Sequence, residues 1–184
     1  MENKETKHDS EIRKANLGTQ TFEKFCNQQP WCKVDKFSQK KYDKWDVSYL
    51  NKGEKTLGEI KVRKEIYDDY ILELDKLAGL KQIQQKLLTR KGINANITYI
   101  NHLPGNITFV WDLTRLDLTK YKIFEKELPK NDYDSTLVMK RVIYLHNCDA
   151  QKFETDEQQS IFNTNQSNDD DDDIEMERIT RLIS

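Results

Sequence analysis

Two different spacings of apolar residues run through the first third of the chain. In "NLGTQTFEKFCNQQP", Phe22, Phe25 and Cys26 recur at the spacing of a helix and Pro30 ends the run, which predicts a first helix over about 17–28. Three stretches follow in which aromatic and β-branched residues roughly alternate with polar ones: "WCKVDKFS", "KWDVSYLNKG" and "TLGEIKVRKE". They predict a three-stranded antiparallel meander.

The helical spacing returns in the middle of the chain. Apolar residues fall three or four apart over Ile71–Leu88 and Gly92 follows, which predicts the longest helix. Beyond it, "ANITYINHLPGNITFVWDL" predicts a hairpin that turns at Pro104-Gly105, and "STLVMKRVIYL" predicts a further strand. "DAQKFETDEQQSIF" is expected to form a short helix capped by Asp149. The predicted order is therefore helix, three-strand meander, helix and further strands.

The length of 184 residues favours one domain with tails. We expect a flexible N-terminal segment over 1–16, a domain over 17–147 and an acidic, largely disordered tail over 148–184. The tail contains five consecutive aspartates, Asp169–Asp173, which repel one another and favour an extended chain. Counted along the sequence, residues 1–145 carry 27 Lys+Arg against 21 Asp+Glu, and residues 146–184 carry 3 against 11. The body is therefore mildly basic and the tail strongly acidic.

Several classes of protein find little support in the composition. The first residues contain no apolar segment of the signal-peptide type, and no run approaches the roughly 18 apolar residues that a membrane helix needs. We therefore expect a soluble cytoplasmic protein with no membrane partner. If the protein is viral, we expect it in the host cytoplasm. The cysteines are odd in number and lack a CxxC spacing, which indicates buried or idle thiols in a reducing compartment: Cys26, Cys32 and Cys148. The histidines lack zinc-ligand spacing: His8, His102 and His146.

The third predicted strand carries an unusual pair of charges. Successive side chains of a strand point to opposite faces, so Glu59 and Lys61 share one face with Leu57 and Arg63, opposite Ile60. Asp46 lies on the preceding predicted strand, and it comes alongside Glu59 if the two strands are hairpin neighbours.

Two carboxylates and an ammonium that converge on one spot are costly without a cation or a phosphate between them, because like charges disfavour each other's ionisation. Mg²⁺ resolves the conflict, since it takes one or two carboxylates, keeps several waters and binds phosphate oxygens. The pattern alone is weak: a chain this charged should contain roughly four Asp/Glu-x-Lys triplets by chance. An ordinary amphipathic surface strand is the alternative.

The residues around this pair resemble the PD-(D/E)xK nuclease superfamily, which has the restriction-endonuclease-like fold, and in particular its small phage-encoded members. The resemblance covers about residues 17–145 and rests on five segments: "FEKF", "KWD", "GEIKVR", "YDDYILELDKLAGL" and "FVWDL". It implies an α/β core with a central mixed β-sheet flanked by helices. It also implies metal ligands at Asp46, Glu59 and the backbone carbonyl of Ile60, a catalytic lysine at Lys61, and an acidic contribution to the metal shell from Glu23.

The sequence departs from the superfamily's pattern at two points. Trp45 stands where the proline of the family name would precede Asp46. The QxxxY pair of processive exonucleases is missing after the second helix, since Gln82 is followed four residues later by Lys86. This favours an endonuclease or nickase over a processive exonuclease.

The neighbouring candidates have ordinary alternatives. Glu73 and Lys76 are candidates to line the active site behind the metal ligands, but a surface ion pair one helical turn apart is favoured. Glu23 is equally well explained as a solvated residue of the first helix. Trp111 and Phe109 are expected in the core rather than as a platform for bases.

Positive charge flanks the predicted site on both sides and favours DNA as the partner. The candidate DNA-binding residues are Lys33, Lys36, Lys40, Lys41, Lys44, Arg63 and Lys64. A solvated lysine-rich loop is the alternative. The acidic tail is expected to contact this basic face or a partner protein, and a homodimer is left open.

The sequence therefore predicts a metal-dependent nuclease that hydrolyses phosphodiester bonds of DNA with Mg²⁺ or Mn²⁺. The alternative is a catalytically inactive nuclease-like protein with a DNA-binding, virion or regulatory role. A third hypothesis treats the acidic tail as a DNA mimic that occupies a partner's basic site. The pattern leaves open whether the substrate is single-stranded, duplex, branched or RNA.

Overall fold

The computed structural model describes residues 7–38, 44–131 and 134–154, which fall almost entirely within one compact unit, Met1–Phe153. Most of the predicted acidic tail, Asp169–Asp173 included, lies outside the described residues, as do Lys40 and Lys41. No helix in these ranges is long and apolar enough to cross a membrane. The elements in chain order are α1 (Lys7–Asn27), β1 (Cys32–Phe37), β2 (Val47–Asn51), β3 (Glu54–Val62), β4 (Asp69–Glu73), α2 (Leu74–Lys91), β5 (Asn96–Leu103), β6 (Ile107–Asp112), the 3-10 helix η1 (Leu118–Lys120), β7 (Phe124–Asn131), β8 (Asp134–His146), the 3-10 helix η2 (Asn147–Asp149) and β9 (Gln151–Glu154).

A six-stranded mixed sheet in the order β1-β2-β3-β5-β6-β9 forms the centre of the body. The predicted meander is confirmed, since β1, β2 and β3 pair antiparallel in sequence order. β3 and β5 pair in parallel, which requires a crossover between them, and α2 lies within that crossover. β5 and β6 form the predicted hairpin, with Gly105 at a positive φ of 76° in its turn. The predicted α/β class with a central mixed sheet is confirmed.

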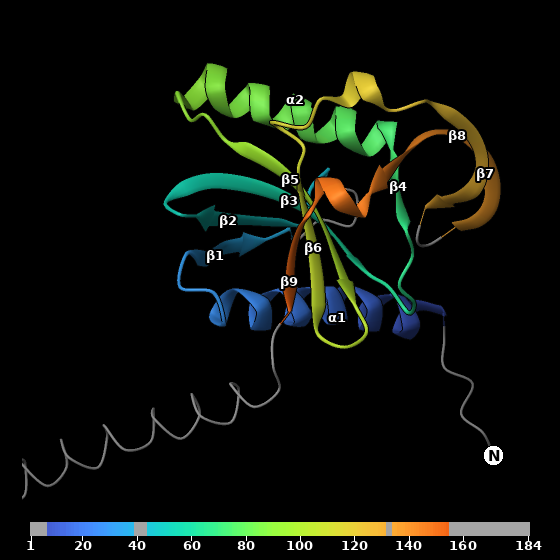
Figure 1. Cartoon of the computed structure of the whole chain (residues 1–184), viewed down its shortest axis with the longest axis horizontal. Helices are drawn as coiled ribbons and strands as arrows, with labels where there is room; N and C mark the ends of the chain where they lie inside the picture. The colour runs from blue at the N-terminus through green and yellow to red at the C-terminus, as the bar shows by residue number, and fades with distance from the viewer. Residues whose placement is uncertain (1–6, 39–43, 132–133, 155–184) are drawn as a thin grey trace, which may run out of the picture. The chain divides into compact units, whose positions relative to one another are not determined.

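The two helices lie on opposite faces of this sheet (Figure 1). Side chains on the two faces of β3 therefore enter different hydrophobic clusters. Leu57 packs in the cluster that contains Leu77 and Leu80 of α2, and Ile60 packs in the cluster that contains Phe22 and Phe25 of α1. This confirms the predicted alternation along β3. Glu59 shares the α2-side face with Leu57, so its carboxylate points into the layer between the sheet and α2.

A second, three-stranded sheet in the order β4-β8-β7 corrects the prediction for the middle of the chain. Residues 71–73 belong to β4, which pairs antiparallel with β8, and α2 spans 74–91 instead of 71–88. The predicted strand over 135–145 is confirmed as part of β8. β7 was not predicted, and it pairs with residues 134–142 of β8 to form a long hairpin.

The two ends of the body also differ from the prediction. α1 begins at Lys7, so residues 7–16 are helical, whereas the first helix was predicted to begin at about residue 17. The helix predicted from Asp149 is wrong over the described residues, because η2 ends at Asp149 and β9 follows it. β9 adds a strand to the central sheet, and Phe153 packs against Phe25 and Trp31, so the compact body extends past residue 147.

Two of the three cysteines form a covalent link that the sequence reading did not predict. A disulfide joins Cys26, near the end of α1, to Cys32, at the start of β1. The expectation of free thiols at these two positions is therefore wrong, and this pair gives no support to a reducing compartment. Cys148 is free and exposed.

Candidate active site

Asp46 is held at the point where β2 begins, between β1 and β3. Its backbone N–H donates to the Gly58 carbonyl at 2.9 Å, and its own carbonyl accepts from the Ser38 N–H at 2.8 Å. Its side chain turns toward β3, where Oδ2 accepts a hydrogen bond from the Ile60 N–H at 2.8 Å. The structure therefore brings Asp46 alongside the Glu59-Ile60-Lys61 segment, as the sequence predicted.

Close packing beneath Asp46 explains the glycine that precedes Glu59. A Cβ at Gly58 would come within 2.9 Å of Val47 Cγ1, closer than real contacts allow, and within 3.0 Å of Ile100 Cδ1, which is tighter than most real contacts. Val47 is opposite Gly58 in the β2–β3 register, one residue after Asp46. Gly58 thus lets the start of β2 approach β3 closely enough for the Asp46 carboxylate to reach the Ile60 N–H.

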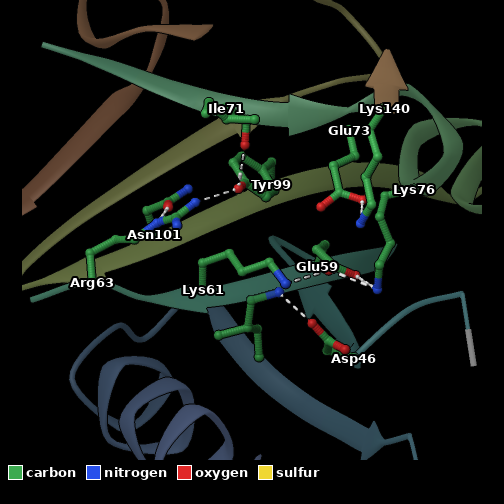
Figure 2. A network of polar contacts seen from close by, with 11 residues as sticks. Asp46, Glu59, Lys61, Arg63, Ile71, Glu73, Lys76, Tyr99, Asn101 and Lys140 are labelled. Atoms are coloured by element: carbon green, nitrogen blue, oxygen red, sulfur yellow. Dashed lines mark hydrogen bonds and ion pairs between the residues drawn. The ribbon is translucent and has the colours of Figure 1, made fainter. Parts of the chain in front are cut away.

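Glu59 is a buried carboxylate between two ammonium groups. Its side chain is 1% exposed, and its Oε1 lies 3.0 Å from Lys61 Nζ and 3.0 Å from Lys76 Nζ (Figure 2). Lys76 Nζ also donates to Oε2 at 3.4 Å. Burial alone would raise the pKa of Glu59, but the charges and hydrogen bonds of Lys61 and Lys76 outweigh it and lower that pKa. Glu59 therefore stays ionised inside the protein.

The negative charge of Asp46 is offset less fully by nearby positive charge than that of Glu59. It is half-buried, and burial followed by repulsion from the Glu59 carboxylate raises the pKa of Asp46 to about 6. Lys61, the Ile60 N–H and Lys76 act in the opposite direction but do not cancel the rise. The pair of carboxylates thus has room for more positive charge than the two lysines supply.

The residues present fit a divalent cation. Glu59 Oε1 is buried and ion-paired with two ammonium groups, each 3.0 Å away, and a divalent cation can replace one of them there. The Ile60 N–H points toward Asp46. In an extended strand the C=O of a residue points to the same side as its N–H, so the Ile60 carbonyl also faces Asp46. No β2 residue pairs with Ile60 on this side, because the last β2–β3 pair is Val47 with Gly58. Two carboxylates and a carbonyl suit Mg²⁺, which keeps waters in its other positions.

The predicted third carboxylate does not join the site. Glu23 is exposed on α1, while its neighbour Phe22 faces the sheet. Over the described parts of the chain, no group of three or more His, Cys, Asp or Glu side chains is placed to hold a metal. The solvated alternative for Glu23 is the one that the structure favours.

The ion pair favoured for the start of α2 is also wrong. Glu73 Oε2 pairs with Lys140 Nζ of β8 at 2.8 Å, whereas Lys76 turns to Glu59 (Figure 2). Lys140 carried no signal in the sequence, because its partner lies 67 positions away in a strand that was read as helix. Lys76 thus belongs to the site, and Glu73 links it to β8.

Arg63 follows the charged face of β3, and part of its guanidinium group is hydrogen-bonded within the protein. Its Nε donates to Asn101 Oδ1 at 2.8 Å and its Nη2 donates to the Tyr99 hydroxyl at 2.9 Å. The Tyr99 hydroxyl in turn donates to the Ile71 carbonyl at 2.9 Å, which links Arg63, the residue after β3, to β5 and β4 (Figure 2). Tyr99 and Asn101 were missed because a strand residue buried beside a charge looks the same in sequence as an ordinary core residue.

The predicted basic residues are not all beside the carboxylates. Lys36 lies near Asp46, with its Nζ 5.5 Å from the centre of the Trp45 ring, and Ser38 bonds the Asp46 backbone. Lys33 lies three residues further back on β1, roughly 10 Å away along the strand. Lys64 is exposed just after β3.

Lys44, two residues before Asp46, packs its side chain against α2. Its methylene chain lies over Gly79 of α2: a Cβ there would come within 2.8 Å of Lys44 Cδ. Gly79 is buried in the middle of a helix, where glycine costs about 1 kcal/mol relative to alanine. The glycine therefore makes room for the Lys44 stem two residues before Asp46.

Comparison with known proteins finds a distant structural similarity. No family model matches the sequence, and a search of curated proteins finds no match. Among solved structures, the chain is similar to Hjc, a Holliday junction resolvase from the archaeal hyperthermophile Archaeoglobus fulgidus, with a TM-score of 0.41 and 12% sequence identity over 71% of this chain and 85% of that one. A similarity this distant assigns no activity, so the function has to follow from the geometry of the site.

Proposed function

We propose that this protein is a metal-dependent nuclease that hydrolyses phosphodiester bonds of DNA, as an endonuclease or nickase. The observation that carries the proposal is the burial of Glu59 between Lys61 and Lys76 with Asp46 fixed beside it by the Ile60 N–H. An amphipathic surface strand would leave Glu59 in solvent, because burying a charge costs several kcal/mol unless it is paired. The placement of these residues at the β2–β3 junction agrees with the PD-(D/E)xK resemblance.

The metal in this proposal is Mg²⁺ or Mn²⁺. Asp46, Glu59 and the Ile60 carbonyl would hold it, for the reasons of charge and orientation given above. When bound in such a site, a divalent cation lowers the pKa of a coordinated water and offsets negative charge that develops on phosphate oxygens. Asp46 supplies the carboxylate that most needs a counter-charge.

Lys61 supplies the positive charge at the solvent-facing boundary of the site. Its side chain is 29% exposed while its Nζ reaches the buried Glu59, so the ammonium lies at the boundary between the carboxylates and solvent. From there it can orient a water or donate to a phosphate oxygen of a bound strand. The Lys61 backbone is fixed opposite Asn101 by the parallel pairing of β3 with β5. The lysine side chain is therefore long enough to place its ammonium beside Glu59.

DNA would be bound by the cations that surround these carboxylates. Lys36 and Lys44 lie on the β1 and α2 sides of Asp46, and Arg63 and Lys64 follow Lys61 at the other end of β3. Arg63 keeps part of its guanidinium for a phosphate, because its contacts to Asn101 and Tyr99 use Nε and Nη2. This arrangement favours contacts to the phosphate backbone, which carry no sequence information directly.

The proposal is tested by incubating the full chain with supercoiled plasmid, linear duplex and single-stranded DNA, each with EDTA, Mg²⁺ or Mn²⁺. The expected result is metal-dependent nicking or linearisation by the wild type and none by Asp46→Asn. Cleavage that continues in Asp46→Asn would place the activity elsewhere or in a contaminant. Absence of cleavage of every DNA form by the wild type, together with retained DNA binding, would favour the non-catalytic alternative.

A further inference from the structure

Glu59 is neutralised twice by lysines that come from different elements. Lys61 reaches it from two residues along β3, and Lys76 reaches the same Oε1 atom from the first turn of α2. The two ammonium groups also act on Asp46, so in the metal-free protein two positive charges face two carboxylates. A divalent cation at Glu59 would be repelled by both lysines, and at least one of them has to withdraw when it binds.

Lys76 is the lysine that the fold leaves able to withdraw. Its side chain is 36% exposed and extends from α2, so the ammonium can leave Glu59 without any movement of the sheet. Lys61, in contrast, lies two residues from Glu59 on the same face of the same strand, and its ammonium stays near the carboxylate in most orientations.

Glu73 is placed to receive the ammonium that leaves. It is the residue just before the first turn of α2, and Lys76 is the third residue of that helix, a spacing at which side chains reach each other. The Glu73 side chain is 31% exposed and pairs with Lys140 through Oε2, and a carboxylate has the acceptor capacity to pair with two cations at once. Exchange from Glu59 to Glu73 would keep Lys76 paired throughout.

We propose that Lys76 is an exchangeable counter-ion of the metal site, pairing with Glu59 in the metal-free protein and with Glu73 once a divalent cation binds at Asp46 and Glu59. The inference rests on the proposed function, because it concerns the same two carboxylates. It assigns Lys76 and Glu73 as positioning residues that set the affinity for the cation, distinct from the role given to Lys61.

The test measures Mn²⁺ binding to the full chain by calorimetric titration without DNA. Each variant is compared with the same variant carrying Asp46→Asn, which removes binding by other acidic segments from the comparison. Lys76→Gln should bind Mn²⁺ about tenfold more tightly than the wild type, because it removes a like charge beside the cation. Lys81→Gln is the matched control, since Lys81 is exposed on the same helix, and it should change the affinity by less than about twofold.

Glu73→Gln gives a second and opposite expectation. Without its receiving carboxylate, Lys76 should compete harder for Glu59, and Mn²⁺ should bind about threefold more weakly. That effect should disappear in the Lys76→Gln background, which is the signature of coupling between the two residues. Lys76→Arg keeps the charge and should bind Mn²⁺ no more tightly than the wild type. If Lys76→Gln does not fold, Glu73→Gln still decides the matter, because unchanged affinity would overturn the exchange.

The outcomes separate this inference from the nuclease proposal. DNA cleavage by the wild type, with equal Mn²⁺ affinity in Lys76→Gln and the wild type, would overturn the exchange and leave the nuclease intact. Tighter Mn²⁺ binding by Lys76→Gln without any DNA cleavage would support the exchange and argue against the nuclease. Absence of Asp46-dependent Mn²⁺ binding in both proteins would overturn both proposals.

Discussion

The stem of Lys44 lies directly on Gly79, so close that a Cβ at residue 79 would come within 2.8 Å of Lys44 Cδ and 3.0 Å of Lys44 Cβ. The contact ties the segment that leads into Asp46 to the middle of α2. Because Lys44 Cβ is next to the backbone, the clash cannot be relieved by moving the end of the side chain alone.

Gly79→Ala should therefore disturb the site although alanine suits the helix better. Helix propensity alone would stabilise the protein by about 1 kcal/mol, and displacement of Lys44 should cancel that gain and weaken metal binding a few-fold. Ala78→Gly is the control, since Ala78 is exposed on the same helix: it should cost about 1 kcal/mol and leave metal affinity unchanged. Urea denaturation and Mn²⁺ titration of both variants check this. A Gly79→Ala protein that is more stable and binds metal normally would show that Lys44 does not position Asp46.

Metal binding should appear as added thermal stability that depends on Asp46. A ligand at a hundred times its dissociation constant stabilises the folded state by about 2.7 kcal/mol, and Asp46→Asn should lose that gain. Differential scanning fluorimetry with Mg²⁺ and Mn²⁺ measures the shift. Deletion of Asp169–Asp173 serves as the control for metal bound by the tail. An equal shift in wild type and Asp46→Asn after that deletion would place the metal at another site.

The elements that the sequence predicts correctly are those that are determined by residues close together in the chain. The face shared by Glu59 and Lys61, the hairpin at Pro104-Gly105 and the β1–β2–β3 meander each follow from a period or a turn within a few residues. Residues 71–73 were misread because isoleucine and leucine at this spacing suit both the end of a strand and the start of a helix. Only the pairing of β4 with β8, about 70 residues away, settles the choice.

The parts of the site that were missed depend on contacts between distant segments. Lys76 was assigned to Glu73 because local spacing is the only evidence that a sequence offers, whereas the buried charge of Glu59 lies 17 residues away. A buried, unpaired carboxylate attracts an ammonium more strongly than an exposed one does, so burial decides the partner. The Cys26–Cys32 disulfide was missed for a related reason, since it depends on how α1 and β1 meet.

Acid should weaken the protein partly through His102. This side chain is 3% exposed, its Nδ1 pairs with Thr108 Oγ1 at 2.9 Å, and burial lowers the pKa of His102 to about 4. The unfolded chain, with a pKa near 6.5, binds the proton first, so the contribution is fully present above about pH 6.5 and is lost as the pH falls toward 4.

The expected loss from His102 is about 2 kcal/mol between pH 7 and pH 5. Asp46 acts in the opposite direction, because its raised pKa makes the protonated form favourable as pH falls through about 6. The comparison is therefore between wild type and His102→Gln, in which the contribution of Asp46 cancels. Urea denaturation at both pH values should show a smaller loss in the variant. Equal losses would mean that His102 takes up its proton without unfolding.

The acidic tail should compete with DNA for the basic face. Residues 155–184 carry nine acidic and two basic side chains, and β9 shows that the truncation must fall after Glu154 and spare the central sheet. Removal of this segment should tighten DNA binding about threefold or more at low ionic strength, with the difference shrinking as salt screens the charges. Fluorescence anisotropy across a salt series measures it. Affinity that is unchanged at every salt concentration would leave the tail without a competitive role.

Lys61 and Glu59 are ion-paired, yet replacing each of them should have a different effect on DNA cleavage and on metal-induced stabilisation. Lys61→Ala removes an ammonium at the solvent boundary and leaves both carboxylates, so metal-induced stabilisation should be kept while DNA cleavage falls about a hundredfold or more. Glu59→Gln removes the buried ligand charge, and both DNA cleavage and metal-induced stabilisation should be lost. Plasmid nicking and thermal shifts measured side by side in Mg²⁺ and Mn²⁺ distinguish the two losses. Metal-induced stabilisation lost equally in both variants would mean that Lys61 organises the metal site itself, and full cleavage by both would mean that the chemistry takes place elsewhere.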